Sequence, residues 1–282
     1  MLFVPADRPD RWGKALASGA DLVCIDLEDA VRPEAKAQAR QAVLDGLRGE
    51  ALTRVALRIN GLRTADGLRD VLALVDAGVA LHAIVLPKTE SPSDVELVHE
   101  WLGQALGHLV ALVETPRAVE HLDAIGAARH RGAPRLGALM LGGADLSTEL
   151  GAKFEWDSLA HARGRLLNAA RAHGLKAWDV PFVDVADEAG LIDETRRVRA
   201  LGFDCKAAIH PAQLAGIHAA FKPDPQELAW AQALLAEMTR HAGGESTRGA
   251  FVFQGRMVDA PILARARRLL ALERMAVAGQ AA

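Results

Sequence analysis

The sequence has 282 residues, of which 50% are apolar and 24% are charged, a composition typical of a globular protein. With 33 Lys and Arg against 36 Asp and Glu, the net charge is only −3, which argues against broad binding of nucleic acid or of an anionic membrane surface. A chain of this length can form one barrel or two ordinary domains.

Short apolar runs alternate with longer segments of helical periodicity up to residue 210. The runs predict strands at 2–6, 22–28, 54–60, 82–88, 108–114, 136–142, 176–181 and 203–210. The segments between them include 33–47, with Pro33 suited to a first helical turn, and 157–174, which ends in a glycine suited to a C-cap. Such alternation indicates parallel strands joined by right-handed crossovers. Eight units fit a (β/α)8 TIM-type barrel better than an open doubly wound sheet.

The pattern changes after Phe221. Asp224 is suited to an N-cap, Pro225 to the first helical position, and Glu227 to the third position of a capping box. A glycine-rich link at 241–251 and a second helical segment at 259–275 follow. We therefore predict a barrel domain at 1–222 and a C-terminal helical extension at 223–282.

Ionisable residues gather at the carboxyl ends of the predicted strands. In a (β/α)8 barrel the loops after these ends meet on one face, where active sites are built. In chain order the residues are Asp26, Glu28 and Asp29 at the end of the second run, Arg58 and Asn60 at the end of the third, Lys88 of the fourth, Glu114 of the fifth, Asp145 just after the sixth, Asp179 near the end of the seventh and His210 at the end of the eighth.

Glu114 and Asp145 end adjacent predicted strands, whose axes would lie about 4.8 Å apart, so both carboxylates can reach one cation. No His or Cys accompanies them. A site of oxygen ligands with open positions favours Mg²⁺, with Mn²⁺ as an alternative, over zinc. The competing interpretation is that the two residues cap the helices that follow them.

Arg58 is one of few cationic residues at the predicted barrel mouth. Its planar guanidinium suits a substrate carboxylate, and an ion pair with Asp26 or Glu28 is the alternative interpretation.

Gly142 and Gly143 allow either close approach of the backbone to an anionic ligand or a simple turn. His210 is expected to be a hydrogen-bonded structural histidine rather than a base.

Seven motifs then occur in order along nearly the whole chain: LFVPADRPDRWGKALASGADLVCIDLEDAV, RIN, LPK, VETP, LGGADL, IHPAQ and QGRMVDAPI. This set resembles the citrate lyase beta-subunit-like family, whose relatives include malyl-CoA and citramalyl-CoA lyases. The family's fold is the (β/α)8 barrel. The sequence departs from the family at Cys205, where relatives commonly have a glycine before the lysine.

The resemblance implies roles for particular residues. Glu114 and Asp145 would ligate Mg²⁺, and Arg58 would hold the carboxylate of a 2-oxo acid. Glu28 and Asp29 would orient the water molecules that complete the coordination of the metal. Arg58 and Glu114, with Gly143 and Ala144 of the LGGADL motif, make up the expected substrate-binding residues.

Asp259 lies in the late MVDAP motif. In the family's lyase branches this residue reaches the site from a neighbouring subunit and handles the proton on the acyl-CoA carbon, which implies a homo-oligomer, a trimer or a hexamer. Its position before Pro261 and a helical segment is also where an N-cap is expected. The two interpretations stay open at this point.

The implied activity is a Mg²⁺-dependent carbon–carbon lyase. It would cleave, or form, a 3-hydroxyacyl-CoA such as malyl-CoA, citramalyl-CoA or a citryl thioester, giving an acyl thioester and a 2-oxo acid such as glyoxylate or oxaloacetate. One alternative is an aldolase on free 2-oxo acids without CoA, and another is a lyase subunit that works only beside an acyl carrier partner. No nucleic-acid or membrane partner is expected.

The sequence favours a cytoplasmic protein. Its start lacks a basic leader, and no apolar stretch approaches the length of a membrane span. Cys24 and Cys205 both fall inside apolar runs, which predicts reduced core thiols rather than a disulfide or a zinc site.

Overall fold

The computed structural model describes residues 1–46, 53–242 and 250–280. The chain divides into two compact units, Met1–Ile217 and His218–Ala282. The sequence-based boundary at 222/223 stays a prediction. Helix α10 (Gln213–Phe221) crosses the boundary between the two units and ends one residue before 222. The predicted glycine-rich link at 241–251 lies mostly outside the described residues.

The first unit contains eight parallel strands among the described residues, hydrogen-bonded in sequence order from β1 to β8. Phe3 N donates to Ala208 O (2.9 Å) and Ala208 N donates to Met1 O (2.8 Å), so the segment after β8 pairs with β1 and closes the sheet. The prediction of a (β/α)8 barrel is confirmed. The strands are β1 Leu2–Pro5, β2 Val23–Asp26, β3 Val55–Arg58, β4 Leu81–Leu86, β5 Leu106–Val113, β6 Leu136–Leu141, β7 Lys176–Asp179 and β8 Cys205–Lys206.

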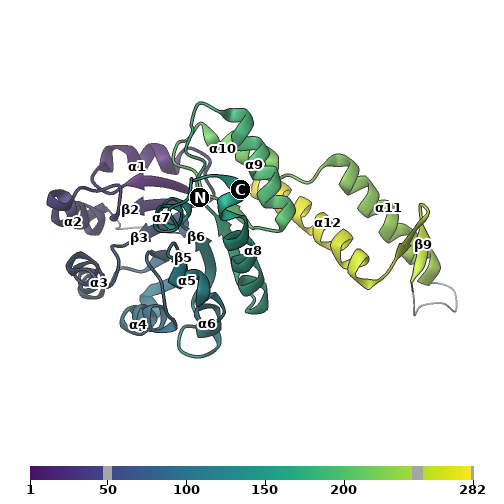
Figure 1. Cartoon of the computed structure of the whole chain (residues 1–282). Helices are drawn as coiled ribbons and strands as arrows, with labels where there is room; N and C mark the ends of the chain where they lie inside the picture. The colour runs from purple at the N-terminus through teal and green to yellow at the C-terminus, as the bar shows by residue number, and fades with distance from the viewer. Residues whose placement is uncertain (47–52, 243–249, 281–282) are drawn as a thin grey trace. The chain divides into compact units, whose positions relative to one another are not determined.

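Every strand of the barrel is followed by at least one helix, and Figure 1 shows these helices around the strands. No helix in the part of the chain that the structure describes combines the length and apolarity needed to cross a membrane. The α-helices of the first unit, including the one that runs past its end, are α1 Pro9–Leu16, α2 Lys36–Gly46, α3 Ala65–Ala77, α4 Pro92–Leu102, α5 Pro116–Glu120, α6 Leu122–Ala127, α7 Gly143–Glu149, α8 Trp156–Ala172, α9 Glu188–Leu201 and α10; short 3-10 helices are η1 Pro33–Ala35, η3 Gly103–Ala105 and η4 Ala128–His130.

Local sequence signals account for several of these boundaries. The predicted helix at 33–47 begins as η1 and continues as α2, with Pro33 in the first turn as expected. Helix α8 ends at Ala172, and Gly174 follows with φ +67°, a left-handed conformation that glycine adopts without a steric penalty.

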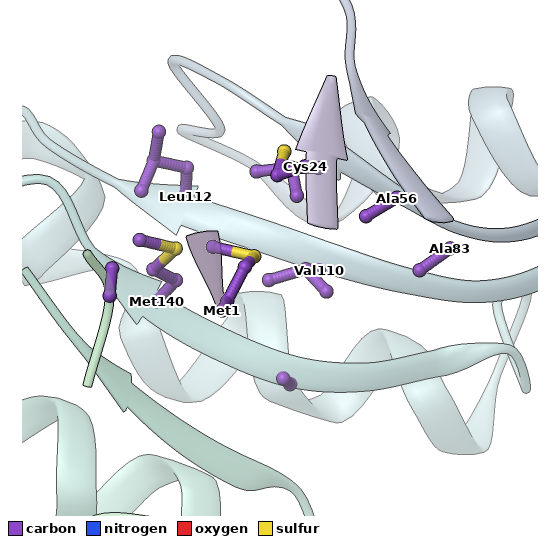
Figure 2. Packing of buried hydrophobic residues seen from close by; sticks show 10 residues of the cluster. Met1, Cys24, Ala56, Ala83, Val110, Leu112 and Met140 are labelled. Carbon is purple, nitrogen blue, oxygen red and sulfur yellow. The ribbon is translucent and has the colours of Figure 1, made fainter. Parts of the chain in front are cut away.

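The interior of the barrel is filled by small and medium apolar side chains from its strands (Figure 2). Alternate residues of a strand point inward, as Val110 and Leu112 do on β5 and Ala138 and Met140 do on β6. Cys24 lies in this cluster and is buried, and both it and Cys205 are free thiols, as the sequence predicted.

The second unit consists of α11 (Pro225–Ala242), a hairpin of β9 (Phe251–Phe253) and β10 (Arg256–Val258), and α12 (Ala260–Gln280). Asp224 Oδ1 accepts from Gln226 N (2.7 Å) at the start of α11, where an N-cap was expected. The hairpin was not predicted. Its strands are only three residues long, and its turn is formed by Gln254 and Gly255, both with positive φ, as the tight turns of hairpins require.

Candidate active site

A cavity of about 450 Å³ lies at the carboxyl ends of the barrel strands. The core side chains Leu112 and Met140 also line it, so the packed interior of the barrel forms one of its walls. Much of the remaining wall is apolar and includes Phe3, Phe154 and Val180. The ionisable residues that line the cavity are Asp26, Asp29, Arg58, Glu114 and Asp145.

The carboxylates of Glu114 and Asp145 converge on one positive charge, the ammonium group of Lys88. Lys88 Nζ contacts Asp145 Oδ2 directly and lies 3.7 Å from Glu114 Oε1. The main-chain N–H of Lys88 also donates to Glu114 Oε1 (2.7 Å). Burial raises the pKa of Glu114 above its ordinary value, while the nearby Lys88 and Arg58 charges act in the opposite direction.

This arrangement fits a magnesium site. The Lys88 ammonium marks a position where a cation is stabilised by both carboxylates, and both are oxygen donors, which Mg²⁺ prefers. Within the described residues no group of three or more His, Cys, Asp and Glu side chains is placed to hold a metal ion. Glu114 and Asp145 would therefore supply two ligands and leave positions for water and substrate oxygens, the usual situation for protein-bound Mg²⁺.

The structure decides against helix capping as the role of these two residues. The N-cap of α5 is Thr115, whose hydroxyl accepts from Ala118 N (3.1 Å). The N-cap of α7 is Gly142 rather than Asp145. Both carboxylates are thus available to the cavity that they line.

Gly142 is required by the space that Glu114 occupies. A Cβ at Gly142 would lie 2.4 Å from Glu114 Cβ and 2.5 Å from its Oε2, closer than such atoms can approach. The φ of Gly142 is −102°, and its N–H donates to Val113 O (2.8 Å), so neither a left-handed turn nor a free amide for a ligand explains it. A Cβ at the buried Gly143 would lie 2.7 Å from Leu159 Cδ1.

Arg58 is held by Asp26 in a bidentate ion pair at the end of two neighbouring strands. Arg58 Nε donates to Asp26 Oδ1 (2.7 Å) and Nη2 donates to Asp26 Oδ2 (2.6 Å). The guanidinium lies over the ring of Phe3, with 5.1 Å from Cζ to the ring centroid. The ion pair that the sequence allowed is therefore formed, and it fixes Arg58 at the wall of the cavity.

Glu28 and Asp29 lie on the other side of the same guanidinium. Arg58 Nη1 is 3.0 Å from Glu28 Oε2 and 3.6 Å from Asp29 Oδ2. Burial raises the pKa of Glu28 to about 8, with Arg58 acting in the opposite direction. Asp29 lines the cavity. Glu28 is buried and does not line the cavity itself, but it contacts Arg58, which does. A role for either beside a metal stays a prediction.

Asp179, at the end of β7, has a structural role instead. It is fully buried, and its carboxylate accepts from Arg163 Nε (2.8 Å) and Lys206 Nζ (2.8 Å). Lys206 Nζ also donates to Val180 O (2.6 Å) and Glu194 Oε1 (2.5 Å). A strand-end position therefore did not suffice to identify a residue of the cavity.

Replacing Asp179 by Asn is expected to lower the free energy of unfolding by about 3–5 kcal/mol, because it removes the fully buried carboxylate that pairs with both Arg163 and Lys206 and leaves these two buried cations to Glu194. Burial raises the pKa of Asp179, but Lys206 and Arg163 outweigh it and hold that pKa below its ordinary value. The carboxylate therefore stabilises the fold above about pH 3.9, and this contribution is lost as the pH falls through the lower folded-state pKa.

Urea unfolding at a series of pH values measures the effect. The difference between wild type and Asp179→Asn should be largest near neutral pH and shrink in acid. The control is Asp123→Asn, a side chain that is 86% exposed, for which a change within about 0.5 kcal/mol is expected. A loss below about 1 kcal/mol for Asp179→Asn would contradict the structural role.

Asp259 belongs to the second unit. Its Oδ1 accepts from Ile262 N (3.3 Å), so it does cap α12, as one of the two interpretations predicted. A role in proton transfer stays a prediction.

His210 is exposed, and its Nδ1 accepts from Ala212 N (3.2 Å), which is in line with the expected structural histidine.

Lys88 is the functional candidate that the sequence did not single out. It was visible as the last residue of the fourth predicted strand, but nothing in the sequence placed its ammonium between two carboxylates that follow other strands. Lys88 also has φ +49°, which is uncommon for a residue with a side chain and worth attention at a site.

Comparison with known proteins places these residues in context. The model of the family described as HpcH/HpaI aldolase/citrate lyase matches residues 1–211. A citrate lyase subunit beta-like protein of Mycobacterium tuberculosis is 39% identical over 276 residues, 95% of this chain and 93% of that protein. An L-malyl-CoA/beta-methylmalyl-CoA lyase of Cereibacter sphaeroides is 34% identical over 92% of this chain and 89% of its own. The crystal structure of CitE from Mycobacterium tuberculosis with magnesium, acetoacetate and coenzyme A is similar at a TM-score of 0.82, with 38% identity over 96% of both chains.

Proposed function

Because the chain belongs to the HpcH/HpaI aldolase/citrate lyase family, we propose that it is a Mg²⁺-dependent carbon–carbon lyase acting on a 3-hydroxyacyl-CoA. The substrate would be malyl-CoA, citramalyl-CoA or a citryl thioester, and the products an acyl thioester and a 2-oxo acid. The same site can run in the condensing direction. The observation that carries the proposal is the convergence of Glu114 and Asp145 on one cation position, in the cavity that Arg58 also lines.

Glu114 and Asp145 would hold the metal. When bound there, Mg²⁺ would supply Lewis-acid chemistry and a template for the oxygen on the carbon that becomes the 2-oxo group. The N–H of Lys88 donates to Glu114 Oε1. Because Gly142 has no side chain, the space next to it is free for Glu114 Oε2. The position of this carboxylate is therefore set before any ligand arrives, which reduces the rearrangement needed on binding.

Arg58 would bind the carboxylate of the 2-oxo acid. Its Nε and one Nη2 donor are engaged by Asp26, and its Nη1 lies 3.0 Å from Glu28 Oε2. A planar anion would bind to the second N–H of Nη1 and of Nη2. Asp26, Glu28 and Asp29 surround the guanidinium and set its orientation. Gly143 and Ala144 would contact the same end of the substrate from the start of α7.

Asp259 would protonate the carbon that becomes the acyl thioester, or deprotonate it in the condensing direction. We propose that it acts on the site of a neighbouring copy in a homo-oligomer, a trimer or a hexamer. A cytoplasmic location, which the sequence favours, is proposed as well.

The purified full chain tests the proposal when it is incubated with Mg²⁺ and each thioester in turn. We expect release of a 2-oxo acid and an acyl-CoA in equal amounts. Mass spectrometry measures both products. Excess EDTA should abolish the release, and added Mg²⁺ should restore it, because two carboxylates without the metal cannot polarise the reacting oxygen.

Free hydroxy-oxo acids and a thioester on an acyl carrier protein serve as comparisons. Cleavage of free acids alone would identify an aldolase that does not use CoA. Turnover of the carrier-bound thioester alone would identify a subunit that works with an acyl carrier. Turnover that persists in EDTA would contradict the role of the metal.

A further inference from the structure

Lys88 combines two contacts with the candidate metal site that come from different parts of the residue. Its ammonium lies between the carboxylates of Glu114 and Asp145, and its main-chain N–H donates to Glu114 Oε1. The side chain is 39% exposed, whereas the side chain of Glu114 is 3% exposed. The positive charge therefore sits at the open side of a buried negative one.

The Lys88 ammonium compensates the negative charge of the Glu114 and Asp145 carboxylates. A buried carboxylate without a counterion is unfavourable, and here two carboxylates face the same point. In the metal-free protein Lys88 supplies the opposing charge. Once a divalent cation neutralises the same two carboxylates, they no longer attract the ammonium, and the cation repels it.

The backbone contact makes departure of the side chain possible without loss of the site. The N–H of Lys88 is a main-chain donor to Glu114 Oε1, so this contact does not depend on where the side chain lies. The flexible four-carbon stem of lysine lets its ammonium move to solvent while the backbone stays in place. Position and charge compensation are thus separable functions of one residue.

We propose that the Lys88 ammonium is an internal counterion that fills the divalent-cation position of the metal-free protein and leaves it when Mg²⁺ binds. Binding of the metal is then an exchange of cations at Glu114 and Asp145. This inference rests on the proposed function, since it takes these two residues as the metal ligands. It makes Lys88 a positioning residue whose ammonium competes with the metal and lowers its apparent affinity.

Isothermal titration of the full chain with MgCl₂, in the absence of any oxo acid, tests the exchange. Lys88→Met removes the competing charge and keeps the main-chain donor, so we expect it to bind Mg²⁺ at least about 10-fold more tightly than wild type. Lys88→Arg keeps a cation and should bind no more tightly than wild type. Lys153→Met, which removes a lysine that is 82% exposed, should leave the affinity unchanged.

Thermal unfolding gives an independent measure of the same competition. In EDTA, Lys88→Met should unfold at a lower temperature than wild type, because its carboxylates lack a counterion. Saturating Mg²⁺ should remove this difference. Equal Mg²⁺ affinity in Lys88→Met would overturn the proposal and leave Lys88 a role toward the substrate only. Weaker Mg²⁺ affinity would also overturn it, because Lys88 would then support metal binding. Absence of Mg²⁺ binding in wild type and Lys88→Met alike would instead overturn the proposed function.

A measurement on the wild type covers the case in which Lys88→Met fails to fold. Amine-selective labelling with peptide mass spectrometry should show that the reactivity of Lys88 rises several-fold on addition of Mg²⁺, while that of Lys153 stays constant. Unchanged reactivity of Lys88 at saturating Mg²⁺ would overturn the exchange.

Discussion

Replacing Glu114 by Gln is expected to abolish turnover and to weaken Mg²⁺ binding by more than about 100-fold, since changes around metal ligands alone already reduce affinity 10- to 100-fold. The amide keeps the shape of the side chain and can still accept from Lys88 N–H, so the barrel should fold normally. Asp145→Asn should act in the same way. Titration with MgCl₂ and the thioester cleavage assay measure the two effects.

Glu120→Gln is the matched control for this pair. The Glu120 side chain is 69% exposed, pairs with Arg165 and does not line the cavity. Its replacement should leave both Mg²⁺ affinity and turnover near wild type. Wild-type Mg²⁺ affinity in Glu114→Gln would remove the metal centre on which the proposed chemistry depends.

Replacing Asp259 by Asn is expected to reduce turnover by about 10²–10⁴-fold, the usual contribution of a general acid or base, while Mg²⁺ and oxo-acid binding stay intact. Asparagine caps helices as well as aspartate does, so the contact with Ile262 N and the start of α12 should persist. The variant therefore separates the two roles that the residue could have. Steady-state kinetics and titration with the oxo acid measure them.

Asp259→Ala completes the comparison, because it removes both the acid and the cap and should also lower stability by about 0.5–2 kcal/mol. If Asp259→Asn retains full turnover, the residue only caps the helix. If it loses Mg²⁺ binding, the assignment to proton transfer is wrong as well.

Mixing the two inactive variants addresses the proposed neighbouring subunit. Oligomers formed by unfolding and refolding Glu114→Gln and Asp259→Asn together would contain sites with an intact Glu114 from one copy and an intact Asp259 from another. Partial recovery of turnover is expected only if the two residues come from different copies.

The sequence determined much of the fold by itself. Each of the eight predicted strands occurs in the barrel, because a short apolar run between longer helical segments favours a strand that is buried on both faces of a parallel sheet. It also indicated the face that carries the site, since residues such as Glu114 and Asp145 follow strands whose carboxyl ends must meet. These features depend on local pattern and on chain direction, which the sequence contains directly.

Tertiary structure alone decided which of the residues at the strand ends act together. Asp179 and Asp145 follow neighbouring strands, yet one is buried between Arg163 and Lys206 and the other faces the cavity. Lys88 meets both candidate metal ligands although it lies 26 residues from Glu114. Such pairings depend on side-chain direction, burial and charge across strands that are distant in sequence, and these are fixed only when the barrel closes.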